Sequence, residues 1–126
     1  MKKFILFFSL AALLWSGELT WSHDYNQTLS LSKKEKKPIL MIYFATWCPE
    51  CNYMEEVVFK DPKLQEYIRT HFLPLSLDIS KDPLPPKFTY KGVPTFFVIS
   101  PDNKEIGKFE GSAAAIEFIE KLKRIR

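Results

Sequence analysis

The sequence predicts an α/β fold, in which a mixed central sheet of about four strands has helices on both faces. Residues 39–45 form an unbroken apolar run rich in branched and aromatic side chains, which is typical of a strand buried on both faces. Segments with apolar residues at helical spacing flank this run and also end the chain. A turn at 101–104 joins two further strand candidates, 95–99 and 105–109, into a hairpin.

A helix is expected before the buried run. Asp24 followed by Gln27 predicts a capping pair at its start. A cluster of lysines suits the negative end of the helix dipole; it comprises Lys33, Lys34, Lys36 and Lys37. Pro38 then ends the helix, because proline cannot donate the next backbone hydrogen bond.

Two helices are expected between the first and second strands. The first follows Cys48 and places apolar residues at spacings of three and four, at Met54, Val57 and Val58. Asp61-Pro62 predicts the start of the second helix, as a cap followed by proline at the first helical position. The apolar face of this second helix consists of Leu64, Tyr67, Ile68 and Phe72.

The second half of the chain supplies the remaining elements. Residues 72–79 are the second strand candidate, and Pro74 favours a place at the start of that strand. Residues 80–87 contain three prolines and are expected to form a loop. Gly111 and Ser112 precede a final amphipathic helix, whose apolar residues are Ile116, Ile119, Leu122 and Ile125.

The composition of the 126-residue chain limits its class. The length suggests one domain, and 46% hydrophobic with 26% charged residues is a globular composition. Two cysteines are too few for a disulfide-dense scaffold or for a four-cysteine zinc or iron–sulfur site within one chain. A formal charge of +3 gives no reason to expect nucleic acid as a partner.

The N-terminus has the pattern of a targeting segment. Lys2 and Lys3 precede an apolar run at 4–15, which predicts a secretory signal peptide over residues 1–17. The cleavage context is poor, so an uncleaved N-terminal anchor stays open, although the run is shorter than the roughly 20 residues of a membrane span. Residues 18–126 would form the domain, exported into an oxidising space such as a bacterial periplasm.

Cys48 and Cys51 are the candidate catalytic residues. Cys48 follows the buried strand and opens a helix, whose N-terminus favours the thiolate, the form that attacks disulfides. Cys51 lies one helical turn further on and can attack the resulting mixed disulfide. We therefore assign Cys48 as the nucleophile and Cys51 as the resolving thiol, and we expect Cys51 to be the more buried of the two.

Other uses of two cysteines fit the pattern less well. A structural disulfide would close a loop too short to gain much entropy. A zinc site would need two further ligands, and His23 and His71 lack ligand spacing. Haem attachment needs a histidine directly after the second cysteine, where Asn52 stands. Copper binding by the two thiols, with Met41 or Met54, stays open.

The cysteine motif, together with Gly92-Val93-Pro94-Thr95, resembles the thioredoxin family. The resemblance implies a thioredoxin fold and a cis peptide bond before Pro94, facing the cysteines. It also implies that the backbone at Val93 binds an extended substrate segment by strand addition. Trp47 would shield the cysteines and contact partners, or only pack. Neither the residues nor the resemblance implies a cofactor or a resident metal.

Further residues are similar to one branch of that family, the C-terminal periplasmic domain of the transmembrane thiol:disulfide interchange reductase and its stand-alone relatives. They are Trp21, Tyr25, Lys37-Pro38, Met54-Glu55, Val58-Phe59 and Asp61-Pro62. Many family members place a buried aspartate six residues before the first cysteine, where this chain has Ile42. Glu55, on the helical face of Cys51, is the candidate substitute as proton acceptor; the alternative is a solvated surface glutamate.

Together these patterns predict an exported thiol:disulfide oxidoreductase that reduces disulfides of periplasmic client proteins. The branch resemblance implies a membrane thiol reductase as electron donor, and we expect a monomer. Two alternatives stay open. The protein could be a dithiol oxidase of exported proteins, or a copper metallochaperone that uses the same two thiols.

Overall fold

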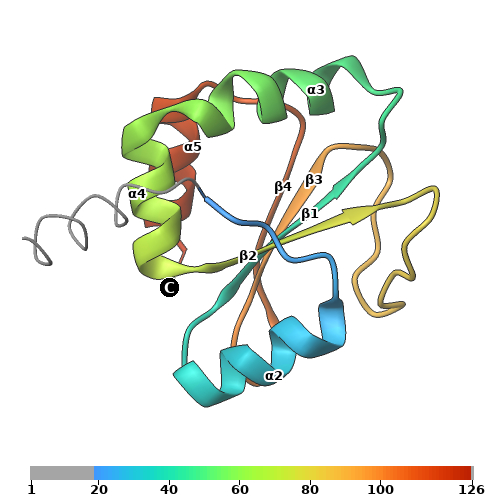
Figure 1. Ribbon diagram of the computed structural model, residues 1–126, viewed down its shortest axis with the longest axis vertical. Helices are drawn as coiled ribbons and strands as arrows, with labels where there is room; N and C mark the ends of the chain where they lie inside the picture. Colours follow the sequence, from blue (N-terminus) through green and yellow to red (C-terminus); the bar gives the residue numbers. More distant parts are fainter. Residues whose placement is uncertain (1–18, 126) are drawn as a thin grey trace, which may run out of the picture.

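The computed structural model describes residues 19–125, so the predicted signal peptide over residues 1–17 lies outside the described part of the chain. A four-stranded mixed sheet in the order β2-β1-β3-β4 forms the centre of the molecule (Figure 1). Its strands are β1 (Ile39–Phe44), β2 (Leu73–Asp78), β3 (Thr95–Ile99) and β4 (Glu105–Glu110). The predicted fold class is therefore confirmed.

β1 is a central strand because both of its edges are paired. It runs parallel to β2, with Ile39 opposite Leu73, and antiparallel to β3, with Ile39 opposite Ile99. β3 and β4 form the predicted antiparallel hairpin. Helices cover both faces of this part of the sheet, which explains why the sequence of β1 is an unbroken apolar run rather than an alternating one.

The helices divide between the two faces of the sheet (Figure 1). One face carries α2 (Tyr25–Glu35), and the other carries α3 (Pro49–Glu56), a short 3-10 turn η1 (Val58–Lys60), α4 (Pro62–His71) and α5 (Ala115–Lys123). Alternate residues of β1 enter two different cores, because successive strand side chains point to opposite faces. Ile39 and Met41 pack on the α2 side, and Leu40 and Ile42 on the side of α3, α4 and α5.

The predicted helix starts are confirmed by their capping hydrogen bonds. The Gln27 amide donates to Asp24 Oδ1 at 3.0 Å, and the Leu64 amide donates to Asp61 Oδ2 at 3.0 Å. Each aspartate thereby satisfies one of the amides that lack a partner in a first helical turn. α2 ends at Glu35, and its C-cap Lys36 has a left-handed backbone (φ 56°), directly before Lys37 and Pro38.

Pro74 is the second residue of β2, and the edge position of that strand explains why it is tolerated. The Leu73 amide donates toward β1, to Pro38 O at 2.9 Å. Because successive strand amides point to opposite sides, the missing N–H of Pro74 falls on the outer side. Residue Ser22 pairs with that outer edge: its amide donates to Pro74 O at 3.0 Å, and its carbonyl accepts from Ser76 N at 2.8 Å.

Two predicted core positions are wrong. Val57 is 56% exposed because α3 ends at Glu56 and the chain continues as a 3-10 turn, which changes the phase of the side chains. Ile116 is 73% exposed because the buried line of α5 passes through Phe118 and Leu122, one turn apart. Ile116 lies two residues before Phe118 and therefore on the opposite side of the helix.

No helix within residues 19–125 combines the length and the apolar character needed to cross a bilayer.

Candidate active site

Cys48 lies where the chain leaves β1 and enters α3. It is the N-cap of α3, with extended backbone angles (φ −93°, ψ 114°), and Pro49 is the first helical residue. Its sulfur accepts a hydrogen bond from the Cys51 amide at 3.1 Å. The thiol of Cys48 therefore takes the place of the hydroxyl or carboxylate that usually caps a helix, and it faces the positive end of the helix dipole.

Cys51 lies one turn into α3, and both cysteines are free thiols. The prediction that Cys51 is the more buried one is wrong, because each residue is 4% exposed. Cys48 is buried in part by Val93, which lies far away in the sequence. Both cysteines pack in a small cluster with Ala45, against the half-buried side chains of Phe44 and Val93 among others.

The segment before β3 faces the cysteines. The Val93–Pro94 peptide bond is cis, and the Cys48 sulfur lies 3.7 Å from the Val93 carbonyl oxygen. Pro94 O accepts from the Gly111 amide at 2.9 Å, which ties this segment to the end of β4. The structure thus brings together Cys48, Cys51, Val93 and Pro94, although 41 residues lie between Cys51 and Val93 in the sequence.

The two thiols differ in their acid–base environment. Burial raises the pKa of Cys51 to about 12, with further contributions from its hydrogen bond with Cys48 and from the negative charges of Cys48 and Glu50. Cys51 therefore keeps its proton at neutral pH while the site is at rest. A protonated second thiol suits a resolving role, because it does not compete with Cys48 for an incoming disulfide.

The surface around Cys48 includes an exposed tryptophan and a fixed acid. Trp47 is 69% exposed, so it does not pack over the buried thiols as a lid. Glu50 Oε1 accepts a hydrogen bond from the Ser112 amide at 3.3 Å, beside Gly111, whose φ is +82°. The contact between Glu50 and Ser112 was not predicted. The only indication in the sequence was the glycine that permits the turn before α5.

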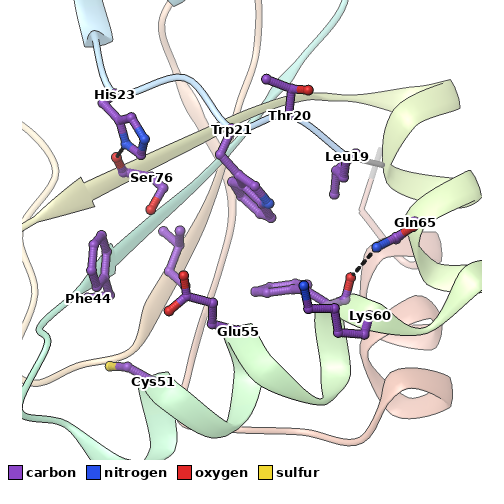
Figure 2. Close-up of a pocket in the computed structure, with 12 residues that line it drawn as sticks. Leu19, Thr20, Trp21, His23, Phe44, Cys51, Glu55, Lys60, Gln65 and Ser76 are labelled. Atoms are coloured by element: carbon purple, nitrogen blue, oxygen red, sulfur yellow. Dashed lines mark hydrogen bonds between the residues drawn. The ribbon is translucent and has the colours of Figure 1, made fainter. Parts of the chain in front are cut away.

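A cavity of about 760 Å³ lies on the α3 side of the sheet, between the start of the described chain and α3 (Figure 2). Cys51 and Ile42 line it, together with Trp21, Glu55 and Lys60. Figure 2 shows Cys51 at one end and the Glu55 carboxylate directed into the hollow. Within residues 19–125, Glu55 makes no hydrogen bond to Cys51, so a direct proton transfer is not set up in this state. Neither the cavity nor Lys60 was predicted from the sequence.

No group of three or more histidine, cysteine, aspartate or glutamate residues in the described part of the chain could hold a metal ion.

Comparison with known proteins identifies the family. The family model described as a thioredoxin-like domain matches residues 25–126. The chain belongs to the thioredoxin-like domain family. The resemblance drawn from the two motifs is confirmed, and Cys48 and Cys51 fit the CxxC pattern of the thioredoxin-like oxidoreductases.

Curated relatives of this thioredoxin-like chain include proteins from plants and bacteria. Thioredoxin Y1, chloroplastic, of Arabidopsis thaliana is 28% identical over 87 residues, which is 68% of this chain and 48% of that protein. The thiol:disulfide interchange protein DsbD of Vibrio vulnificus is 30% identical over 59 residues, which is 47% of this chain and 10% of that protein. The chain thus spans about half or less of the length of these two relatives.

Solved structures agree with the thioredoxin-like fold. A thioredoxin from Thermus thermophilus superposes with a TM-score of 0.75 at 24% identity, covering 86% of this chain and 87% of that one. The oxidised C-terminal domain of DsbD from Neisseria meningitidis gives a TM-score of 0.71 at 21% identity, covering 85% of this chain and all 100% of the other. At these identities the two comparisons establish the fold.

Proposed function

We propose that the protein is an exported thiol:disulfide oxidoreductase that reduces disulfides of client proteins through Cys48 and Cys51. The observation that carries the proposal is the position of Cys48: it caps α3, accepts the Cys51 amide and faces the carbonyl of Val93. A thiol in this position lies at the N-terminus of a helix and has a second thiol one turn away. Family membership adds independent support.

The reaction proceeds through two exchanges of sulfur partners. The Cys48 thiolate attacks one sulfur of the client disulfide; a bond forms between them, the client disulfide breaks, and the departing client sulfur takes the electron pair and a proton. Cys51 then loses its proton and attacks the Cys48 sulfur, which releases the second client sulfur. The client gains two electrons and two protons, and the protein is left with a Cys48–Cys51 disulfide.

Resolution of the mixed disulfide requires a proton acceptor for Cys51, because its pKa is raised to about 12 in the resting dithiol. The site lacks a carboxylate at position 42, where β1 presents Ile42 to the cavity. We assign this role to Glu55, whose carboxylate enters the same cavity (Figure 2). Since no direct hydrogen bond joins the two groups in the described structure, a water molecule in the cavity would relay the proton.

The client binds along the segment before β3 in this proposal. The backbone at Val93 pairs with an extended client segment in the manner of strand addition, and the Val93 carbonyl oxygen lies 3.7 Å from the Cys48 sulfur. The exposed ring of Trp47 adds an apolar contact next to the reacting sulfur. Glu50, held by Ser112, places a negative charge at the edge of the same surface.

Export and the direction of electron flow are part of the proposal. The basic pair and apolar run at the N-terminus favour export, with an uncleaved anchor as the alternative. The relative named thiol:disulfide interchange protein favours thiol–disulfide exchange, and the branch resemblance of the sequence implies a membrane thiol reductase as electron donor. A measured reduction potential tests the direction: a value near that of thioredoxin, about −270 mV, supports reduction, and one near about −120 mV favours the dithiol oxidase.

Trapping of mixed disulfides tests the proposed function. In cells that produce the full chain, Cys51→Ser should accumulate mixed disulfides through Cys48, visible as reducible bands, because the resolving thiol is missing. The matched control is Cys48→Ser, which keeps a buried thiol but lacks the nucleophile and should give none. Equal trapping by the two variants, or no trapping by Cys51→Ser, would overturn the assignment of roles.

A further inference from the structure

We propose that Glu50 makes this protein select client disulfides in which a lysine or arginine stands next to the attacked cysteine. The inference rests on the proposed function, because it concerns the clients of that reaction. It deepens that function by assigning a specificity-determining residue and by naming the class of client that the site favours.

The Glu50 carboxylate lies beside the segment that faces Cys48. Pro94 O, in that segment, accepts the Gly111 amide at 2.9 Å. The next amide along the chain, that of Ser112, donates to Glu50 Oε1 at 3.3 Å. Glu50 also stands two residues after Cys48, in the first turn of α3. Two connections, one through the backbone at Gly111 and one through α3, therefore keep this carboxylate at the edge of the client surface.

Gly111 leaves one side of the carboxylate uncovered. A Cβ atom on Gly111 would lie 3.9 Å from Glu50 Oε1, so a side chain at this position would lie against that oxygen. The left-handed backbone of Gly111 (φ +82°) favours glycine, which has no Cβ. Glu50 itself is exposed. The carboxylate is thus held in place without being buried, as a residue that contacts clients must be.

The negative charge of Glu50 is not neutralised by a neighbouring cation. Within residues 19–125, Glu50 forms no ion pair, and its hydrogen-bond donor is a neutral backbone amide. An exposed charge of this kind attracts cations and repels anions over a range of roughly 10 Å at 0.1 M salt. Lysine and arginine are the client residues that carry a positive charge throughout the neutral pH range.

The place of the basic residue follows from the geometry of an extended client. In the proposed function the client pairs with the backbone at Val93, whose carbonyl oxygen lies 3.7 Å from the Cys48 sulfur. Neighbouring residues of an extended segment are only about 3.3 Å apart. A residue beside the client cysteine therefore stays close to Cys48, and a long, flexible basic side chain there can turn toward Glu50.

Glu50 has a second electrostatic effect, which a test must separate from client selection. Burial is the main cause of the raised pKa of Cys51, and the negative charge of Glu50 adds to it. That effect acts on the protein's own thiol and changes the rate with every client by the same factor. Client selection changes the ratio of rates between clients of different charge, so this ratio is the quantity to measure.

Three short peptides that differ only in charge provide the ratio. Each carries a single cysteine bonded to 2-thiopyridine, with lysine, glutamine or glutamate on both sides of the cysteine. The fully reduced full-length protein is mixed with each peptide at low salt. Release of 2-thiopyridone in the first exchange is followed by stopped-flow absorbance, and the rate with the lysine peptide is divided by the rate with the glutamine peptide.

The variants isolate the charge of Glu50. Glu50→Gln keeps an oxygen that can accept the Ser112 amide, so it removes the charge and retains the contact. The lysine-to-glutamine ratio should fall about threefold in this variant, the size expected of one exposed charge pair. Glu50→Lys should instead favour the glutamate peptide. The matched control Glu56→Gln alters an exposed residue roughly 9 Å further along α3 and should leave the ratio unchanged. Equal ratios in the wild type and Glu50→Gln overturn the inference.

Salt provides an independent readout. At about 1 M salt the screening length falls to about 3 Å, so the wild-type ratio should fall to that of Glu50→Gln. A ratio that does not respond to salt overturns the inference. The glutamine peptide tests the proposed function separately. A wild-type protein that reacts with this peptide through Cys48 but shows no charge selectivity loses only the inference, whereas no reaction with any peptide contradicts both.

Discussion

The Cys51 amide donates a hydrogen bond to the Cys48 sulfur at 3.1 Å, so the backbone of the second cysteine stabilises the side chain of the first. The same turn of α3 places the Cys51 thiol in a buried environment that raises its pKa to about 12. One helical turn therefore places two equally buried cysteines differently: Cys48 caps the helix, and Cys51 keeps its proton at neutral pH. This asymmetry underlies the proposed reaction.

The raised pKa of Cys51 predicts a pH dependence of stability. The folded dithiol keeps the Cys51 proton as the pH rises from 9.0 toward about 12, whereas the unfolded chain loses it. The stabilisation from this group is thus complete below about pH 9 and declines above it. The free energy of unfolding of the reduced protein, measured with urea, should fall between about pH 8 and pH 10.5. The fall should be larger in the wild-type protein than in Cys51→Ala. Equal losses would contradict the burial of a neutral thiol.

Glu55→Gln should slow the resolution of the mixed disulfide at neutral pH, because the amide cannot accept the Cys51 proton. A loss of about 100-fold is at the lower end of general-base effects. The measurement is single-turnover release of the second client sulfur, followed by rapid quench. Glu56→Gln, the next residue on α3 and also exposed, is the control. An unchanged rate in Glu55→Gln would identify this glutamate as a solvated surface residue.

Trp47→Ala should separate packing from partner contact. Since the side chain is 69% exposed, the change in unfolding free energy should stay within about 0.5 kcal/mol. The apparent affinity for a disulfide-bonded client should fall, seen as a raised KM in a turnover assay. A large loss of stability with unchanged KM would reverse the interpretation and make Trp47 a packing residue.

Truncating a side chain to alanine should have very different effects on stability on the two sides of α5. Phe118 is completely buried and contacts the rings of Phe59 and Phe96, at centroid distances of 5.5 and 4.9 Å. Phe118→Ala should cost about 3–5 kcal/mol, the range for large aromatic truncations in cores. Ile116→Ala, at a 73% exposed position, should change stability by about 0.5 kcal/mol or less. Similar costs at both positions would contradict the phase of this helix.

Local rules explain how much of the fold the sequence predicts. The caps at Asp24 and Asp61, the apolar run of β1 and the hairpin of β3 and β4 depend on interactions within a few residues, and each is found as expected. The error at Val57 arises because its exposure depends on where α3 ends. The error at Ile116 arises because its exposure depends on which side of α5 packs against the core. Spacing alone cannot determine either of these.

The site shows the same division. The cysteine pair and the segment at Val93 and Pro94 are recognisable in the sequence because their spacing and neighbours are distinctive. The equal burial of Cys48 and Cys51 cannot be recognised in the sequence, because Val93, which packs against both cysteines, lies in a loop far away along the chain. The cavity also depends on long-range packing. It forms between α3, β1 and the segment around Trp21, and a local sequence pattern cannot predict a cavity between such distant segments.

Stoichiometric reduction of a disulfide-bonded protein tests the central claim most directly. The fully reduced chain, with no other reductant present, is mixed with insulin, and both proteins are analysed by mass spectrometry after an acid quench. We predict that insulin loses one disulfide for each Cys48–Cys51 disulfide formed, and that Cys48→Ser abolishes the transfer. Failure of the wild-type chain to transfer electrons, or equal transfer by Cys48→Ser, would contradict the account.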